Sequence, residues 1–273
     1  MLKSATAFSL GRALVGVATL ASGILQLVQG DFVRLVPKPP AWVPEPSLLA
    51  YLTGASLVAI GFALLTGHMA RTAAALLAAM ILLVVAFLYA PLMLANPVVD
   101  RPFLRGFMWT NPLKSLALAG GAAMLAAASS GAARPFPALV AAVGRRGAMG
   151  PALLAIFLAV CGVQHFVYAD FVTTLVPTWL PAPRFWTDFA GVALVAGGVG
   201  ILVPKTSRLA ASMSALMVFL WVLLLHIPRA LTEANHAFET AGVFEALAIS
   251  GTALLVAAQR DGARESGVPP PAA

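Results

Sequence analysis

The stretch RTAAALLAAMILLVVAFLYAPLMLA, residues 71–95, decides the class of this protein. Its only charged residue is Arg71 at the first position, and most of the remaining side chains are Leu, Ala and other apolar residues. A helix needs about 20 mainly apolar residues to cross a bilayer, where only internal hydrogen bonds satisfy the backbone. The stretch is therefore predicted to be a transmembrane helix.

The composition of the whole chain points the same way. Of 273 residues, 60% are apolar and 10% are charged, whereas a soluble globular protein carries about 25% charged residues. A water-soluble domain of this size could not solvate itself with so few charges. Cys161 is the only cysteine, so no disulfide can form within the chain. A soluble enzyme, a disordered protein and a secreted disulfide scaffold are thereby excluded.

Eight segments are apolar and long enough to span a membrane. They are roughly 8–28, 47–66, 71–95, 112–130, 150–168, 185–203, 208–231 and 240–258. Strands are not expected, because the runs are rich in Leu and Ala and lack alternation. We therefore predict an all-α, polytopic membrane protein with eight transmembrane helices and both termini on one side.

Basic residues are unevenly distributed around these eight spans. Ten of the 17 Lys and Arg residues, but only two of the ten acidic ones, lie on the side that holds both termini. Because cytoplasmic loops of membrane proteins collect Lys and Arg, both termini are predicted to be cytoplasmic. The net charge of +7 then reflects topology, and no nucleic-acid partner is inferred from it.

The two halves of the chain resemble each other. Asp31-Phe32-Val33 recurs as Asp170-Phe171-Val172. Matches at an offset of 137 residues include Gly54 with Gly191, Gly61 with Gly198, Arg71 with Arg208 and Pro91 with Pro228. We predict a tandem repeat of two four-helix bundles, residues 1–130 and 150–258. A cytoplasmic linker, 131–149, is expected between them and a disordered tail, 259–273, after them.

The repeated glycines and prolines also predict local packing. Gly54 and Gly61 are seven residues apart, and so are Gly191 and Gly198. The two glycines of each helix therefore share one helix face, where a neighbouring helix can approach closely. An ordinary abundance of glycine in a Gly/Ala-rich chain explains the spacing equally well. Pro91 and Pro228 are expected to kink the third helix of each half near its outer end.

A family resemblance follows from the last helix of the first half, which reads Asn111-Pro112-Leu113-Lys114-Ser115-Leu116-Ala117 before a run of glycines. A four-span unit ending in this way resembles the DoxX-like family of bacterial membrane proteins. The second half is similar to a divergent branch of that family, with Gln164-His165-Phe166 and Leu224-Leu225-His226-Ile227-Pro228-Arg229. The resemblance implies a link to redox systems, since the family's namesake accompanies a quinol-linked terminal oxidase and relatives accompany thiol or oxidative-stress systems.

The chain departs from the family in two respects. It carries the four-span unit twice, and Glu245 stands where the first half has Lys114. The single cysteine argues against a dithiol mechanism. No residue is assigned a catalytic role, because most members of the family have no established activity.

Polar and ionisable side chains inside the predicted spans concentrate in the second half. They are Gln164, His165, Asp188, His226, Arg229 and Glu245, against Gln26, Gln29, Tyr89 and Lys114 in the first half. His165 and His226 fall near the outer ends of their spans, and Glu245 lies about 9 Å deeper than Glu239 along the last helix. Because ionisable groups in a membrane are costly and mark sites or pathways, these six residues are the candidate ligand site.

Three kinds of ligand suit this candidate site. Two histidines and a carboxylate can bind a divalent metal, and two histidines on facing helices can ligate a haem. His, Glu and Arg can also hydrogen-bond a quinone head group and exchange protons, because histidine titrates near neutral pH. The resemblance favours the quinone. The structural alternative is that these side chains reach water or pair with one another, for example Glu245 with Arg229.

The outer loop 170–183 contains a tryptophan and several prolines. It is expected to be a rigid interfacial turn, with a lid over the bundle as the alternative. The leading functional hypothesis is a redox-associated accessory or quinone-binding component, with the lipid bilayer and a membrane or periplasmic redox protein as partners. A small-solute transporter and a membrane scaffold without ligand are the alternatives.

A reporter inserted into the 131–149 linker tests the predicted sidedness. Alkaline phosphatase, which is active only in the periplasm, should be inactive there, and green fluorescent protein should be fluorescent, because this side carries most of the basic residues. The same reporters in the outer loop 170–183 should give the opposite result. Phosphatase activity from the linker would overturn the orientation.

Overall fold

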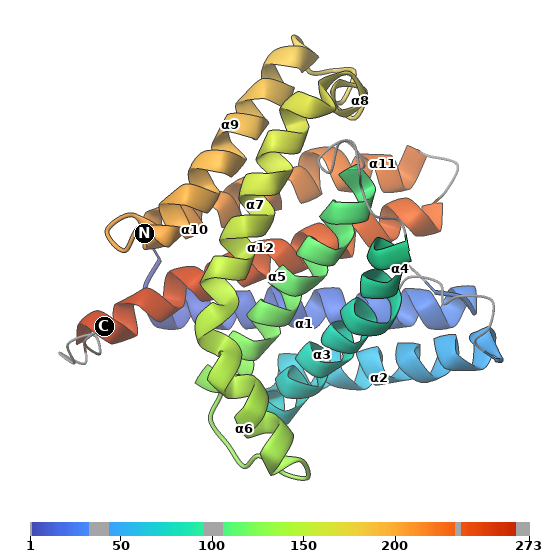
Figure 1. Cartoon of the computed structure of the whole chain (residues 1–273), viewed down its shortest axis with the longest axis vertical. Helices are drawn as coiled ribbons and strands as arrows, with labels where there is room; N and C mark the ends of the chain where they lie inside the picture. The colour runs from blue at the N-terminus through green and yellow to red at the C-terminus, as the bar shows by residue number, and fades with distance from the viewer. Residues whose placement is uncertain (1, 33–43, 96–105, 233–235, 266–273) are drawn as a thin grey trace.

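The computed structural model describes residues 2–32, 44–95, 106–232 and 236–265, and its regular elements in these ranges are all helices (Figure 1). The long helices are α1 (Ser4–Gln29), α2 (Pro46–Thr66), α3 (Ala70–Val84), α5 (Gly106–Ala128), α7 (Gly150–Val167), α9 (Pro183–Leu202), α10 (Ser207–Trp221) and α12 (His236–Glu265). The short helices are α4 (Ala90–Ala95), α6 (Pro137–Arg145), α8 (Ala169–Thr173) and α11 (Ile227–Thr232). The all-α class predicted from the sequence is confirmed.

Seven helical stretches among the described residues are long and apolar enough to cross a membrane. They are Ser4–Gln29, Pro46–Thr66, Ala70–Tyr89, Pro137–Val167, Pro183–Leu202, Ser207–Thr232 and His236–Gln259. The remaining predicted span, 112–130, overlaps α5, whose polar residues Asn111 and Lys114 lower its mean hydropathy. The chain is therefore a multi-pass membrane protein.

The long helices pack in an order that crosses between the halves of the chain. Helix α1 packs on α2, α2 on α3 and α3 on α5, and in the same way α7 packs on α9, α9 on α10 and α10 on α12. Helix α12 also packs on α1, and α5 on α7. Helices α5 and α12 contact each other, so they lie at the centre and each touches both halves (Figure 1).

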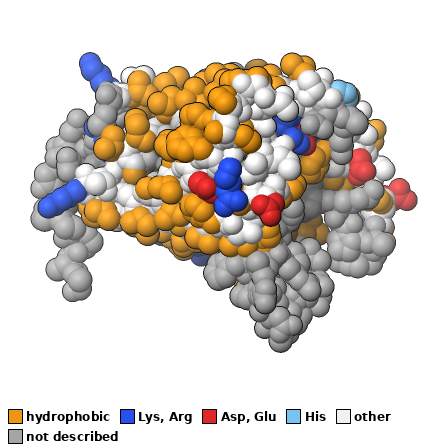
Figure 2. Space-filling view, turned by 90° about the horizontal axis from the view of Figure 1, so that it is seen from above, with side chains coloured by type: hydrophobic (Ala, Val, Ile, Leu, Met, Phe, Trp, Pro, Cys, Tyr) orange, Lys and Arg blue, Asp and Glu red, His pale blue; other side chains and the backbone are white. Residues whose placement is uncertain are grey.

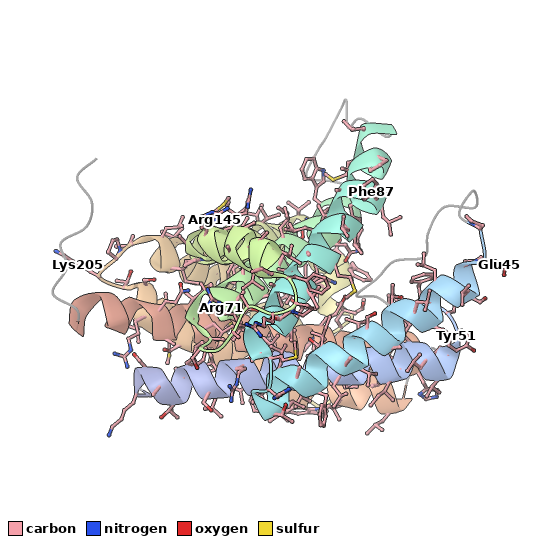
Figure 3. The ribbon with its side chains drawn as sticks, turned by 90° about the horizontal axis from the view of Figure 1, so that it is seen from below. Glu45, Tyr51, Arg71, Phe87, Arg145 and Lys205 are labelled. Atoms are coloured by element: carbon pink, nitrogen blue, oxygen red, sulfur yellow. The ribbon has the colours of Figure 1, made fainter. Side chains whose placement is uncertain are left out.

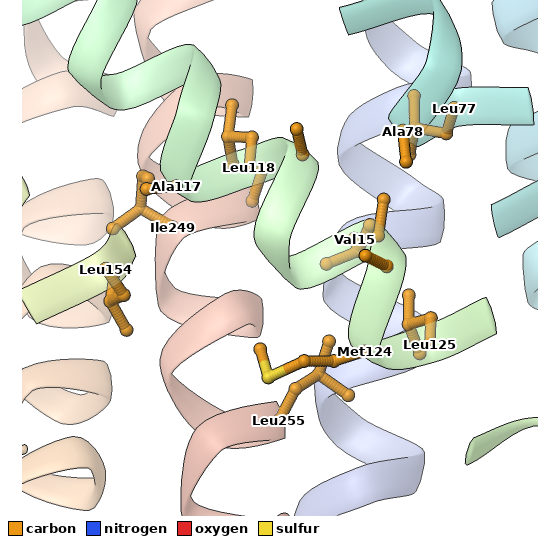
Figure 4. Packing of buried hydrophobic residues seen from close by; sticks show 14 of the residues in the cluster. Val15, Leu77, Ala78, Ala117, Leu118, Met124, Leu125, Leu154, Ile249 and Leu255 are labelled. Atoms are coloured by element: carbon orange, nitrogen blue, oxygen red, sulfur yellow. The ribbon is translucent and has the colours of Figure 1, made fainter. Parts of the chain in front are cut away.

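The buried apolar core surrounds these two central helices. Figure 4 shows this packing from close by, with labelled side chains from α1, α3, α5, α7 and α12. The buried residues of α5 include Ala117, Leu118, Met124 and Leu125, and those of α12 include Ile249 and Leu255. Many core positions are alanine or glycine, and such small residues let apolar helices approach one another closely in a membrane.

The outer surface is apolar over wide areas, as a lipid-facing surface should be. Hydrophobic side chains cover most of the face shown in Figure 2, with a small group of acidic and basic side chains near its middle. In Figure 3, Lys205, Arg145 and Arg71 lie toward one end of the bundle, and Glu45 and Tyr51 lie at the other. The two ends of the chain lie on the same side in Figure 1.

The repeated glycines lie where the neighbouring helix comes closest. A Cβ atom on Gly61 of α2 would overlap the backbone of Leu20 on α1. A Cβ atom on Gly198 of α9 would lie 2.6 Å from the carbonyl oxygen of Ala155 on α7. These contacts leave no room for a side chain, so the close helix approach predicted from the glycine spacing is confirmed.

Each of the two prolines follows a widened helical turn. A π-helical turn, Val85–Tyr89, precedes Pro91, and a second one, Val222–His226, precedes Pro228. Proline lacks a backbone N–H and its ring crowds the carbonyl four residues earlier, which in both cases belongs to the π-helical turn. The missing N–H and the crowding at each proline are thus accommodated by a wider helical turn. The second of these turns ends at His226.

The predicted linker and tail contain more helix than expected. Helix α6 occupies much of 131–149 and packs on α3 and α5, with Val140 and Val143 buried. Its apolar face explains this packing, because burying that face stabilises the helix. Helix α12 continues past residue 258 to Glu265, and residues 266–273 of the predicted tail lie outside the described residues.

Substitution of Gly61 tests the close packing of α1 and α2. Gly61→Ala should destabilise the protein by roughly 1–3 kcal/mol, because the added methyl group forces two backbones apart. Gly144→Ala is the matched control, since a Cβ there meets only ordinary contacts at 3.7 Å or more. The control should be neutral or stabilising by up to about 1 kcal/mol, because alanine favours helix. Thermal unfolding in detergent followed by tryptophan fluorescence measures both, and equal melting temperatures would contradict the prediction.

Candidate functional site

The central helices are joined by a buried ion pair. Lys114 Nζ of α5 lies 2.7 Å from Glu245 Oε2 of α12, and the two side chains are 15% and 7% exposed. Lys114 Nζ also donates a hydrogen bond to Asn111 Oδ1 at 3.2 Å. A buried charge that loses its water needs a partner and hydrogen bonds of this kind, because desolvation is otherwise too costly.

This ion pair borders a cavity of about 160 Å³, whose wall is formed by Lys114 and by residues of the second half of the chain. Polar side chains on its wall come from four helical elements, and they are Lys114, Cys161, His165, His226 and Glu245. Apolar residues such as Phe157, Leu194 and Val218 complete the wall. The structure thus brings three of the six candidate residues, His165, His226 and Glu245, around one space.

His165 is held in a defined orientation. Its Nδ1 atom lies 2.8 Å from the carbonyl oxygen of Cys161 on the same helix. Because a carbonyl oxygen only accepts, Nδ1 carries the proton in this contact, and in the neutral ring Nε2 is an acceptor. The imidazole also stacks on Trp221, with ring centroids 6.2 Å apart and an interplanar angle of 26°. Two contacts therefore orient the ring at the cavity wall.

A larger apolar groove adjoins the cavity. It has a volume of about 620 Å³, lies between α9 and α10, and shares His165, Trp221 and His226 with the smaller cavity. Its other lining residues are almost all apolar, including Trp179, Trp186, Phe189 and Leu220. The outer loop 170–183 supplies part of the wall through Val172, Leu175, Val176 and Pro177. The cavity, which has several polar side chains in a mainly apolar wall, and the apolar groove therefore adjoin at the two histidines.

The other three candidate residues lie outside the cavity wall. Gln164 accepts a hydrogen bond from Thr110 Oγ1 of α5 at 2.6 Å. Asp188 forms an exposed pair with Arg184 one turn earlier on α9, at 3.0 Å. The first contact joins α5 to α7 and the second lies within α9. Neither Gln164 nor Asp188 lines the 160 Å³ cavity.

The pairing of Arg229 differs from the structural alternative considered above. Arg229 binds Glu239 through two hydrogen bonds of 3.1 and 3.2 Å, while Glu245 binds Lys114. The alternative in which Glu245 pairs with Arg229 is therefore wrong. Glu239 and Glu245 are six residues apart, about 1.7 helical turns, so they point to different faces of α12 and meet different partners.

Lys114 and Trp221 of the cavity wall were not among the sequence candidates for the site. Lys114 has a signal in the sequence, since it matches Glu245 between the halves and has the opposite charge. Trp221 stands in an apolar run, where nothing separates a cavity-lining tryptophan from one that faces lipid. Spatial proximity alone identifies it.

The wall chemistry bears on the three predicted ligand classes. Among the described residues, no group of three His, Cys, Asp or Glu side chains is arranged to hold a metal ion. His165 and His226 line both the cavity of about 160 Å³ and the groove of about 620 Å³. Histidine, ammonium and carboxylate groups beside an apolar groove suit a small polar head with an apolar tail.

Breaking the ion pair tests whether it holds the central helices together. Lys114→Met and Glu245→Met should each destabilise the protein by about 3–5 kcal/mol, because each leaves the other charge buried alone. The double variant should recover much of this loss, since both charges are replaced by apolar side chains. Asp188→Asn removes an exposed pair and should cost about 0–1 kcal/mol. Thermal unfolding measures all four, and a Lys114→Met variant as stable as Asp188→Asn would contradict the interpretation.

Comparison with protein families finds two matched regions. The family described as DoxX matches residues 7–90, and a family described as a domain of unknown function, DUF8561, matches residues 154–257. Among curated proteins and solved structures, nothing matches the chain. The match over α1, α2 and α3, together with the apolar helices, supports an integral membrane protein that is similar to the DoxX family.

Proposed function

We propose that this protein binds an amphipathic ligand of the quinone class and serves as a redox-associated component of the bacterial inner membrane. The observation that carries the proposal is that His165 and His226 line both the apolar groove and the cavity in which Lys114 and Glu245 lie. A ligand with a polar ring and a long apolar tail matches this pair of spaces. A water-soluble ligand would make no favourable contact with the apolar groove.

The head group would lie among Lys114, His165, His226 and Glu245. Quinone carbonyl oxygens are hydrogen-bond acceptors, so the Lys114 ammonium and a protonated imidazole are suitable donors. Quinol hydroxyl groups are donors, which the Glu245 carboxylate and His165 Nε2 can accept. A bound quinone would supply two-electron, two-proton chemistry, and this wall offers groups that can hold and exchange the protons.

The tail would lie in the groove between α9 and α10. Its wall is formed by apolar residues of both helices, and the groove also runs under the outer loop 170–183. Burial of an isoprenoid tail there would be favoured by contact with Trp186, Phe189 and Leu220. This arrangement supports a lid function for the outer loop, because six of its apolar side chains line the space.

We further infer that the chain is a tandem repeat of eight spans, with α5 as the fourth. The matching order of helix packing in α1–α5 and α7–α12 supports the repeat. So does the offset of 137 residues between the two π-helical turns. The Arg208 guanidinium donates a hydrogen bond to the Leu2 carbonyl, which supports an N-terminus on the same side as the α9–α10 connection. The basic character of that side supports a cytoplasmic location.

A small-solute transporter is the second candidate. It is favoured by the buried Lys114–Glu245 pair beside a cavity, since buried charges in membrane proteins often mark a transport pathway. The two candidates differ in the ligand they require. A transporter for a polar solute would not depend on the apolar groove.

Labelling of Cys161 tests the quinone proposal. Cys161 is the only cysteine of the chain and lines the cavity, so reaction with a lipophilic maleimide, followed by intact mass spectrometry, reports access to this space. Decylubiquinone at ten times its Kd should slow the labelling about tenfold by mass action. Absence of protection by benzoquinones and naphthoquinones would overturn the proposal, and protection by polar solutes alone would favour the transporter.

Two substitutions on α9 provide a matched pair. Ala193→Trp fills the groove and should abolish protection by decylubiquinone. Val199→Trp adds the same bulk at an exposed position of α9 outside the groove and should leave protection intact. Equal effects of the two variants would show that the groove does not hold the tail.

A further inference from the structure

Glu245 also borders a second, much smaller chamber on the opposite side from the ligand cavity. The chamber has a volume of about 20 Å³ and lies between α1, α3, α5 and α12. Its polar wall consists of Thr19, Ser22, Glu245 and Thr252. A space needs about 10–15 Å³ by this measure to hold one water molecule. The chamber therefore has room for a single water and for nothing larger.

Thr252 provides the second observation. Its side chain lies on α12 and is 1% exposed, and its Oγ1 atom has no hydrogen-bond partner among the described residues. A hydroxyl group buried in this way is destabilising unless something pairs with it. The partner must come from the chamber that Thr252 lines.

The chamber offers enough further hydrogen-bonding groups for a water. Thr19 Oγ1 donates to the Val15 carbonyl at 2.8 Å, so its oxygen remains able to accept. The Glu245 carboxylate can accept several hydrogen bonds, of which Lys114 supplies one. Two to four polar partners are what a buried water requires, whereas a wholly apolar cavity of this kind stays dry.

Gly121 of α5 preserves this space. A Cβ atom at position 121 would lie 2.5 Å from Thr252 Oγ1. Any larger residue would therefore press on the side chain of Thr252, which lines the chamber. The glycine allows α5 and α12 to pack closely while Thr252 keeps its place.

We infer that the chamber binds one water molecule, which hydrogen-bonds Thr252 and Glu245. Glu245 then faces water on the side of α1 and the ligand cavity on the side of α7. The water site does not depend on the proposed ligand.

Thr252→Val tests the water site, because valine keeps the shape of threonine and removes the hydroxyl. If the water is present, the variant loses its hydrogen bond and the melting temperature should fall by roughly 2–4 °C. If the chamber is dry, the variant removes an unsatisfied hydroxyl, and an unchanged or higher melting temperature would overturn the inference. Thr252→Ser keeps the hydroxyl and should keep the water.

A direct structural measurement accompanies the stability measurement. A structure of the wild type at a resolution that shows waters should contain density about 2.7–3.2 Å from Thr252 Oγ1. The Thr252→Val structure should lack it. Ser250→Ala is the matched control, because Ser250 donates to the Ala215 carbonyl on α10 and does not line the chamber. Its structure should retain the density, and an empty chamber in the wild type would overturn the inference.

The same variants separate this inference from the proposed function. Protection of Cys161 by decylubiquinone should be unchanged in Thr252→Val, because Thr252 does not line the ligand cavity. If decylubiquinone fails to protect Cys161 in the wild type but the water density is present, the ligand proposal alone is overturned. Retained protection with no density would overturn the water site alone.

Discussion

The Lys114–Glu245 ion pair is the constraint on which the rest of the arrangement depends. An isolated charge inside an apolar protein costs several kcal/mol, so each of these side chains requires the other. Lys114 lies on α5 and Glu245 on α12, and these helices belong to different halves of the chain. Satisfying the two charges therefore obliges the halves to assemble around the central pair of helices. The core confirms this geometry, because small side chains of both helices are buried where they meet.

Each half also depends on the last helix of the other. Helix α1 packs on α12, and α7 packs on α5, so neither set of four helices forms its contacts alone. The family matches reflect this division, since the DoxX match ends at residue 90 and the second match begins at residue 154, which leaves α5 between them. The helix that supplies Lys114 is therefore the connection between two regions that resemble different families. Its polar residues are expected to reflect this position rather than lipid contact.

The sequence predicts those features that depend on periodicity and composition. Long apolar runs predict the helices. The seven-residue spacing of Gly54 and Gly61, and of Gly191 and Gly198, predicts the close helix contacts, because both features follow from local geometry. The convergence of His165, His226 and Glu245 could be anticipated from their depths, but their partners could not. Which carboxylate meets Arg229 depends on how α11 and α12 rotate, and the pairing of Lys114 with Glu245 depends on how the halves pack. Side-chain pairing of that kind is decided by tertiary contacts, on which a single sequence carries little information.

The two halves differ in the way they orient side chains at matching positions. At positions that the proposed repeat aligns, Gln26 and His165 are oriented differently. Gln26 donates hydrogen bonds to the Ala50 carbonyl and to Thr53 on α2, which binds it to the neighbouring helix. His165 instead bonds to its own helix and stacks on Trp221 of α10, so its ring faces the junction of cavity and groove. The chamber beside α1 and α3 has a volume of about 20 Å³, and the cavity beside α7 has a volume of about 160 Å³. Glu245 of α12 borders both spaces.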